Sequence, residues 1–193
     1  MKKEDLLSKL RKNTREQFDM PDLTINAIKY PDTVKQFIEM SQTVGGKVKC
    51  IKKGDDVNEV IQQLYPEAKV FASNVPGITI AQKNPDTVDE ANDLNGTDVG
   101  ILQGELGVAE NGCIWVPQTM KEKAICFISE ELVILLDKKN IVDNMHEGYK
   151  RIEVPALGYG CWISGPSKTA DIEQALVMGA QAARGVTVLI IED

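Results

Sequence analysis

Residues 160–191 read GCWISGPSKTADIEQALVMGAQAARGVTVLII, and this stretch decides the fold that the chain is expected to adopt. The apolar runs GCWIS and VTVLII at its two ends predict strands. Between them, apolar and small residues recur at the spacing of one helix face, which predicts a helix from about Thr169 to Ala183, ended by Arg184–Gly185. The residues that set this spacing are Ile172, Ala175, Leu176 and Gly179. A strand, a helix and a strand in succession indicate an α/β fold.

The same alternation of helix and strand runs back towards the N-terminus. Helices are predicted at residues 31–44 and 57–65, the second capped by Asp55 or Asp56. The strands that follow them are KVKCI at 47–51 and AKVFAS at 68–73. Residues 76–95 are polar and rich in turn formers, so a loop with a short helix is expected there.

The middle of the chain continues the pattern. Four apolar runs follow one another at residues 98–102, 112–116, 124–128 and 131–136. The last of them leads into a predicted helix within residues 138–152. Such alternation favours a largely parallel sheet with helices on both faces.

The N-terminal residues predict a separate helical arm. Apolar and small residues fall near one face of a helix, while lysines and arginines lie mostly elsewhere. The residues of this face are Leu6, Leu7, Leu10, Thr14 and Phe18. We expect residues 1–20 to form an arm that packs on the body or on a partner, and residues 21–193 to form the α/β domain.

Composition excludes some classes of partner. The chain of 193 residues carries 29 Asp and Glu against 22 Lys and Arg, a formal net charge of −7. An acidic chain repels the phosphates of nucleic acid, so no nucleic-acid partner is expected. No apolar run reaches the roughly 18 residues of a membrane span, and the first residues lack the apolar core of a signal peptide. We therefore expect a cytoplasmic protein without a membrane span.

Cysteine and histidine usage argues against a metal or cofactor site within this chain. The four cysteines, Cys50, Cys113, Cys126 and Cys161, show neither Cys-x-x-Cys pairs nor cluster spacing, so we expect buried reduced thiols. His146 is the only histidine, and one chain cannot supply the two or three imidazoles of a zinc or non-haem iron site. A Ser-His-Asp triad would have to use that residue.

The loop within the opening stretch predicts a binding site for a small anion. The chain turns at Gly165, and Ser167 or Thr169 caps the predicted helix. The first backbone N–H groups of that helix and the ammonium of Lys168 would then face an anion, at the carboxyl end of a strand, where open α/β sheets bind ligands. Asp171 fits a cap through the helix dipole, and a capped helix with a solvated lysine is the alternative that the residues leave open.

A second candidate lies in residues 100–116, GILQGELGVAENGCIWV. Asn111–Gly112 between apolar runs predicts a tight hairpin, and Glu110 stands at its edge. A carboxylate held there can act as a general base, as a nucleophile towards an acyl group, or as an acceptor of backbone N–H bonds. The residues do not choose between these roles. Glu105, outside the turn, is expected to be a solvated acid.

Three segments resemble the LUD family of lactate utilisation proteins: GVAENG (107–112), ELVILLDKKNIVDNM (131–145) and ISGPSKTADIEQALVMGAQAARGVTVLIIED (163–193). The resemblance implies a Rossmann-like layered α/β fold, as in the superfamily of CoA-transferases and sugar-phosphate isomerases. It also implies a role in oxidising L-lactate to pyruvate beside an iron–sulfur partner. In that role this chain is the subunit without a redox group, and it binds a small anionic metabolite.

The resemblance also identifies candidate site residues. In the loop, the family's recurrent positions correspond to Gly165, Pro166, Ser167, Thr169, Asp171 and Glu173, with Lys168 where a basic residue is usual. In the turn, they correspond to Ala109, Glu110, Asn111 and Gly112. Where the family usually has His-Gly-Pro, this chain has Gln181, Ala182 and Ala183, and a glutamine removes any proton transfer there.

Two other functions stay open. The AENG turn is similar to the Ser-Glu-Asn-Gly turn of class I CoA-transferases, which would make the chain an acyl-CoA transferase or thioesterase with Glu110 as its nucleophile. The chain could instead be a regulatory or interaction module without catalysis, whose arm binds a partner. The sequence decides neither whether the chain is an enzyme nor whether it forms a homo-oligomer.

Overall fold

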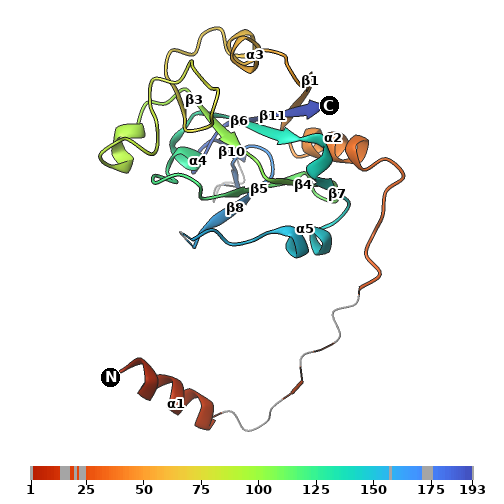
Figure 1. Cartoon of the computed structure of the whole chain (residues 1–193), viewed down its shortest axis with the longest axis vertical. Helices are drawn as coiled ribbons and strands as arrows, with labels where there is room; N and C mark the ends of the chain where they lie inside the picture. Colours follow the sequence, from red (N-terminus) through yellow and green to blue (C-terminus); the bar gives the residue numbers. More distant parts are fainter. Residues whose placement is uncertain are drawn as a thin grey trace.

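The structure is a computed structural model that describes residues 2–13, 18–19, 21, 25–156, 158–170 and 176–192. Its centre is a parallel five-stranded sheet in the order β1-β11-β6-β3-β2 (Figure 1). The strands are β1 (Lys47–Lys52), β2 (Phe71–Ser73), β3 (Val99–Gln103), β6 (Glu131–Asp137) and β11 (Gly185–Glu192). The predicted α/β fold with a mainly parallel sheet is confirmed.

The burial of the strands follows their position in the sheet. The central strands β6 and β11 each bury five consecutive residues, because parallel strands are covered on both faces and consist of continuous apolar runs. Strand β1 lies at an edge and places Lys47, Lys49 and Lys52 along it, as edge strands that avoid pairing with another chain commonly do.

A second sheet of four strands lies against the first. Its order is β7-β4-β5-β8, with one parallel pair, β4 and β7, and two antiparallel pairs. The strands are β4 (Leu106–Val108), β5 (Cys113–Pro117), β7 (Ile141–Val142) and β8 (Gly160–Ile163). The predicted hairpin at Asn111–Gly112 is confirmed: it joins β4 to β5, Gly112 has a φ of +67°, and its N–H donates to the carbonyl of Val108.

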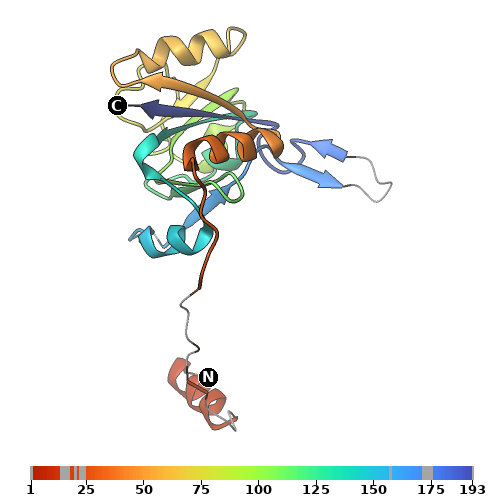
Figure 2. The ribbon, with the colours of Figure 1, turned by 90° about the vertical axis from the view of Figure 1, so that its right-hand side faces the viewer.

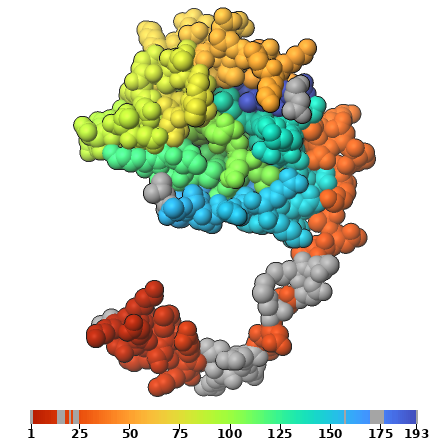
Figure 3. All heavy atoms as spheres, viewed as in Figure 1, coloured from red at the N-terminus to blue at the C-terminus, as the bar shows by residue number. Residues whose placement is uncertain are grey.

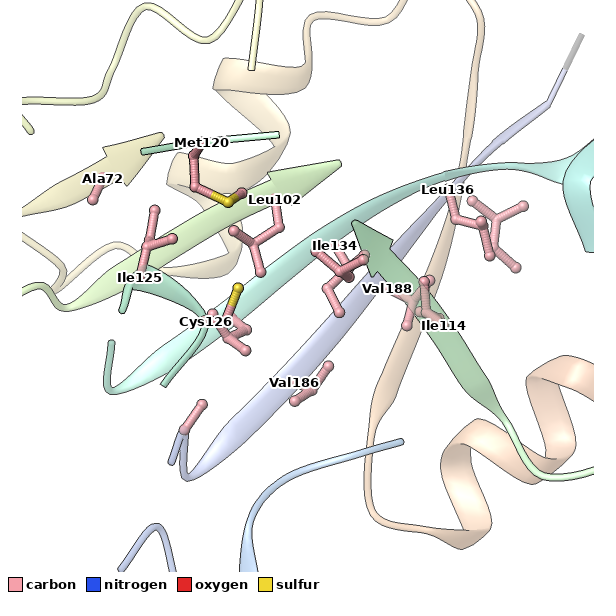
Figure 4. Packing of buried hydrophobic residues seen from close by; sticks show 14 of the residues in the cluster. Ala72, Leu102, Ile114, Met120, Ile125, Cys126, Ile134, Leu136, Val186 and Val188 are labelled. Carbon is pink, nitrogen blue, oxygen red and sulfur yellow. The ribbon is translucent and has the colours of Figure 1, made fainter. Parts of the chain in front are cut away.

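The parallel sheet is covered differently on its two faces. One face packs against α3 (Val57–Leu64) and the chain segment that follows β2. The other packs against the second sheet, α4 (Ile125–Ile128) and α2 (Thr33–Thr43), and Figure 4 shows Ile114 of β5 beside Ile134 of β6 and Val188 of β11. The second sheet replaces part of the helical cover expected on this face, because Ile114 and its neighbours alternate as strand residues do.

Helix α5 (Met145–Arg151) covers the outer face of the second sheet. Trp115 of β5 and Trp162 of β8 lie with their ring centroids 5.4 Å apart, and Tyr149 of α5 packs edge-on against Trp162 at 5.8 Å. The short 3₁₀ helices are η1 (Ala91–Leu94) and η2 (Lys138–Asn140). The helix predicted within residues 138–152 is confined to Met145–Arg151, because η2 and β7 occupy residues 138–142.

The helix predicted from about Thr169 to Ala183 is wrong in the residues that the structure describes. Strands β9 (Lys168–Ala170) and β10 (Leu176–Met178) pair antiparallel, and Figure 2 shows them projecting away from both sheets. Residues 171–175 lie outside the described residues. The pairing places the β-branched Val177 opposite Thr169, a favourable cross-strand pair, so tertiary hydrogen bonding overrides the helical spacing.

Helix α1 (Lys3–Asn13) lies within the residues predicted to form the N-terminal arm. It buries no residue, Leu6 and Leu7 remain 43% and 40% exposed, and Figure 3 shows the helix set apart from the body. Within the described ranges, no helix combines the length and apolar character needed to cross a membrane.

Candidate functional site

The predicted anion loop packs against the C-terminal end of α2. The ammonium Nζ of Lys168 donates to the carbonyl of Val44, the C-cap residue of that helix, at 2.6 Å. Gly165 has a φ of +65°, and a Cβ at this position would lie 2.7 Å from the same carbonyl oxygen. A cation at a helix C-terminus is favourable because the exposed carbonyls carry partial negative charge. Lys168 thus has a structural role in addition to any role towards a ligand.

The local geometry differs from the predicted helix start. The N–H of Ser167 donates to the carbonyl of Ala183, and its carbonyl accepts from the N–H of Gly179, so both backbone groups join the base of the hairpin. Thr169 lies in β9 opposite Val177, and Asp171 lies outside the described residues. The prediction that an anion binds at the first turn of a helix here is therefore wrong, because Ser167 precedes strand β9 and Thr169 lies in it.

A cavity of about 420 Å³ nevertheless lies beside this loop. Gly165, Pro166, Ser167 and Lys168 line it, together with buried apolar side chains and the segment before β11. The other residues of its wall are Cys126, Phe127, Leu132, Trp162, Ile163, Ser164, Gln181, Ala182, Ala183 and Val186.

The cavity lies at the amino ends of strands β6 and β11, where Leu132 and Val186 are each the second residue of their strand. The loop follows the carboxyl end of β8, as predicted, but β8 belongs to the second sheet. The rule that open parallel sheets bind ligands at their carboxyl ends therefore does not support this cavity, because that end of the parallel sheet is the opposite one.

The Asn111–Gly112 turn touches the start of the loop. The hydroxyl of Ser164 donates to the backbone carbonyl of Asn111 at 2.9 Å, and the side-chain Oδ1 of Asn111 accepts from the N–H of Cys113 at 3.1 Å. Gly112 lies so close to α2 that a Cβ would stand 2.9 Å from the backbone nitrogen of Ser41. The two predicted site segments are thus neighbours, joined through Ser164.

The side chain of Glu110 contacts the start of α5. Its exposed carboxylate accepts a hydrogen bond of 3.0 Å from the backbone N–H of Met145, the first residue of α5. Its own N–H donates to the carbonyl of Asp143. Of the three roles open to this residue, the geometry favours an acceptor of backbone N–H bonds, and Glu110 is not among the described residues that line the cavity.

The structure brings together two cysteines that sequence spacing did not connect. Cys126 of α4 is buried in the cavity wall, and Cys161 of β8 is half-buried beside it, with their thiols in hydrogen-bond contact. The hydrogen bond from Cys126 lowers the pKa of the Cys161 thiol, whereas the same contact and burial raise the pKa of Cys126. The contact depends on where α4 and β8 pack in the same core cluster, which the spacing of the cysteines in the sequence does not show.

A second cavity, of about 430 Å³, lies at the carboxyl end of β3. Gln103, Glu105, Asn140 and Glu153 contribute amides and carboxylates to it, and the side chain of Gln103 already donates to the carbonyls of Gly104 and Leu135. Glu105 is exposed, as expected of a solvated acid. Across the described ranges, no three His, Cys, Asp or Glu side chains converge as metal ligands do.

Comparisons with known proteins agree with the resemblance seen in the sequence. The chain is 26% identical over 133 residues to lactate utilization protein C of Geobacillus thermodenitrificans, covering 65% of this chain and 53% of the relative. It is 29% identical over 119 residues to the protein of the same name from Geobacillus sp. (strain WCH70), covering 58% and 47%. The chain thus spans about half the length of the curated relatives it matches.

Structure and family models extend these matches. The crystal structure of a DUF162 family protein from Deinococcus radiodurans superposes with a TM-score of 0.65 and 12% identity, covering 86% of this chain and all of that one, which shows a shared fold. The model of the LUD domain matches residues 84–191, more than half of the chain and including both the turn and the loop. The chain belongs to the LUD domain family.

Proposed function

We propose that this protein acts in the utilisation of lactate or a related organic acid, and that it binds a small organic anion in the cavity beside residues 164–168. One observation carries the proposal. The segment in which the family resemblance is most specific, SGPSK, lines a cavity large enough for such a molecule. The relatives named lactate utilization protein C supply the class of metabolite.

The chemistry of the cavity suits a short hydroxy or oxo acid. Ser167, Lys168 and Gln181 bring hydroxyl, ammonium and amide groups to its wall, and Leu132 and Val186 bring apolar surface. Small-molecule sites typically combine a mostly apolar lining with a few polar groups that orient the ligand. A carboxylate would pair with the ammonium, since charge-assisted hydrogen bonds are the stronger ones.

Calorimetric titration of the full chain with L-lactate and with pyruvate tests the binding. Because Lys168 lines the cavity, Lys168→Gln should weaken binding by about tenfold, the effect of one charge-assisted hydrogen bond. Ala182→Phe should abolish binding by filling the cavity. Lys53→Gln, which removes the same charge at an exposed site outside the cavity, is the matched control.

Melting curves of each variant separate lost binding from lost structure, because Lys168 also bonds to Val44. If neither acid binds the wild-type chain, or if Lys168→Gln and Ala182→Phe bind as tightly as wild type, the proposed site is wrong.

The proposed system includes a separate iron–sulfur subunit as the carrier of electrons. This part rests on the family resemblance and on the absence of any nucleotide fingerprint or cluster spacing in the sequence. Affinity isolation of the tagged chain from its native cells grown on lactate should recover a cysteine-rich iron–sulfur protein. Recovery of the chain alone, from lysates prepared at low salt, would contradict the subunit arrangement.

A further inference from the structure

The four cysteines occupy different surroundings. Cys50 is exposed on the edge strand β1, and Cys113 is half-buried beside Ser164, with burial raising the pKa of its thiol. Cys126 and Cys161 face each other in side-chain contact. All four lie within the described part of the chain, and among them this pair alone is in thiol-to-thiol contact.

The contact is fixed by rigid elements. Cys161 is a strand residue that pairs with Val116 of β5, and its side chain points into the core between the two sheets. Cys126 follows Ile125 at the start of α4, and Ile125 is fully buried in the same core. Figure 4 shows the sulfur of Cys126 above the central strands. Because neither backbone is a free loop, the two sulfurs stay near each other.

The two thiols are also unequal. Cys161 is only half-buried, so a small reagent can reach it, and the thiol of Cys126 donates a hydrogen bond that favours its thiolate. Cys126 is 3% exposed and lies in the cavity wall. A half-buried thiol of lowered pKa beside a fully buried thiol is the arrangement of an attacking and a resolving cysteine.

We propose that Cys126 and Cys161 form a dithiol site that reduces small hydroperoxides and becomes a reversible disulfide. The Cys161 thiolate attacks the outer oxygen of the hydroperoxide, the O–O bond breaks, and an alcohol, or water from hydrogen peroxide, leaves. Cys161 is then a sulfenic acid. The sulfur of Cys126 attacks the sulfur of Cys161, the S–O bond breaks, and the departing hydroxide takes the proton of Cys126 and leaves as water. Two thiols and one hydroperoxide give one disulfide, one alcohol and one water.

The disulfide would tie α4 to β8 beside the cavity. Cys126 lines the cavity. Cys161 lies in β8, and three residues, Trp162, Ile163 and Ser164, separate it from the loop at Gly165–Lys168 that also lines the cavity. The proposal concerns the thiols themselves and stands independently of any anion that binds there.

The test uses the reduced full chain treated with an equimolar amount of hydrogen peroxide and then with N-ethylmaleimide. Intact mass should show a loss of about 2 Da, the two thiol hydrogens, and alkylation at Cys50 and Cys113 only. Proteolysis should yield a peptide that links Cys126 to Cys161, and dithiothreitol should restore both thiols.

Variants assign the two roles. Cys126→Ser should accumulate a sulfenic acid at Cys161 that reacts with dimedone. Cys161→Ser should react with peroxide at least about tenfold more slowly, because the remaining thiol of Cys126 is buried and burial raises its pKa. The control is a double variant, Cys50→Ser with Cys113→Ser, and after peroxide it should still form the disulfide between Cys126 and Cys161. Four alkylated thiols after peroxide, a link to Cys50 or Cys113, or overoxidation of Cys161 without a link would each overturn the proposal. The wild-type peptide map decides the question even if a variant does not fold.

Discussion

Gly165 holds a conformation that other residues adopt only with strain, and it does so against the end of α2. Gly165→Ala should destabilise the fold by about 1–3 kcal/mol, because it adds strain at φ +65° and a clash with the carbonyl of Val44. Gly158→Ala is the matched control, since φ there is +74° and a Cβ would meet nothing within 4 Å. Urea unfolding measures both, and an equal loss of stability in the two variants would contradict the clash.

Glu110 should matter for stability through α5. Glu110→Ala removes the acceptor for the N–H of Met145 and should cost about 0.5–2 kcal/mol, as the loss of a helix cap does. Glu110→Gln keeps an acceptor oxygen and should cost less. Thermal melting of the two variants checks that Glu110→Ala lowers the melting temperature more than Glu110→Gln does.

The same pair of variants tests the alternative of acyl transfer. A nucleophilic Glu110 would leave a mass adduct with an acyl-CoA that disappears in Glu110→Gln. We expect no adduct across a panel of acyl-CoA thioesters, because the carboxylate is already engaged at the start of α5.

At the scale of elements, Asp98 joins the beginnings of β2 and β3. The N–H groups of Lys69 and Val70 donate to its carboxylate and lower its pKa. Because the folded pKa lies below the unfolded value, this interaction stabilises the fold above about pH 4 and is lost as the pH falls through the folded pKa.

Asp98→Asn should therefore flatten the acid side of the stability profile. Carboxylates titrate within about pH 3 to pH 7. Urea unfolding over this range measures how steeply the free energy of unfolding changes with pH. Asp5→Asn on α1, which removes a carboxylate from a helix that buries no residue, is the control. If the two variants respond to acid alike, the role assigned to Asp98 is wrong.

The β9–β10 hairpin can be distinguished from the helix predicted there by one substitution. Alanine is the better helix former and the poorer strand former, so Val177→Ala should destabilise a hairpin and stabilise a helix, by about 0.5 kcal/mol in each case. Val177 is 41% exposed, so lost core packing contributes little. Carbon chemical shifts of residues 168–170 and 176–178 provide the independent readout, and helical shifts would contradict the hairpin.

The elements that sequence predicts well are those whose signals are local. Asp56 accepts from the N–H groups of Asn58 and Glu59, as expected of a cap, and the runs at 131–136 and 186–191 are strands because apolar continuity is itself the signal of a buried parallel strand. The helix from Thr169 fails because Ile172 and Leu176 satisfy helical spacing whatever the backbone does. The observed strands are held instead by backbone hydrogen bonds between residues distant in sequence, from the N–H of Ser167 to Ala183 and from the N–H of Gly179 to Ser167.

At the scale of the whole molecule, the N-terminal arm is predicted to be dispensable for folding. Helix α1 buries no residue, so a chain lacking residues 1–20 should melt within about 2 °C of the full chain, the range of a change that disturbs no core contact. Calorimetry checks this, and a large fall in melting temperature would show that the arm packs on the body. Loss of a co-purifying partner at unchanged melting temperature would assign the arm to that partner.

The candidate site shows where sequence reasoning ends. The turn at Asn111 and the loop after Ser164 were each identified from glycines and motif, and only the structure shows that a hydrogen bond joins them. The same holds for Cys126 and Cys161, which no spacing connects. Such proximity depends on how two sheets stack, and stacking is a property of the complete fold.

The position of β11 has a consequence for the order of assembly. This strand lies between β1 and β6 and pairs with both. Its Thr187 lies opposite Lys47 of β1, and its Gly185 lies opposite Glu131 of β6. Synthesis from the N-terminus delivers β11 after both neighbours, so β1 and β6 each keep an unpaired edge until residues 185–192 are made. Strand pairs between residues far apart in the sequence form slowly. The unpaired edges of β1 and β6 are therefore the surfaces that a chaperone would need to shield during synthesis.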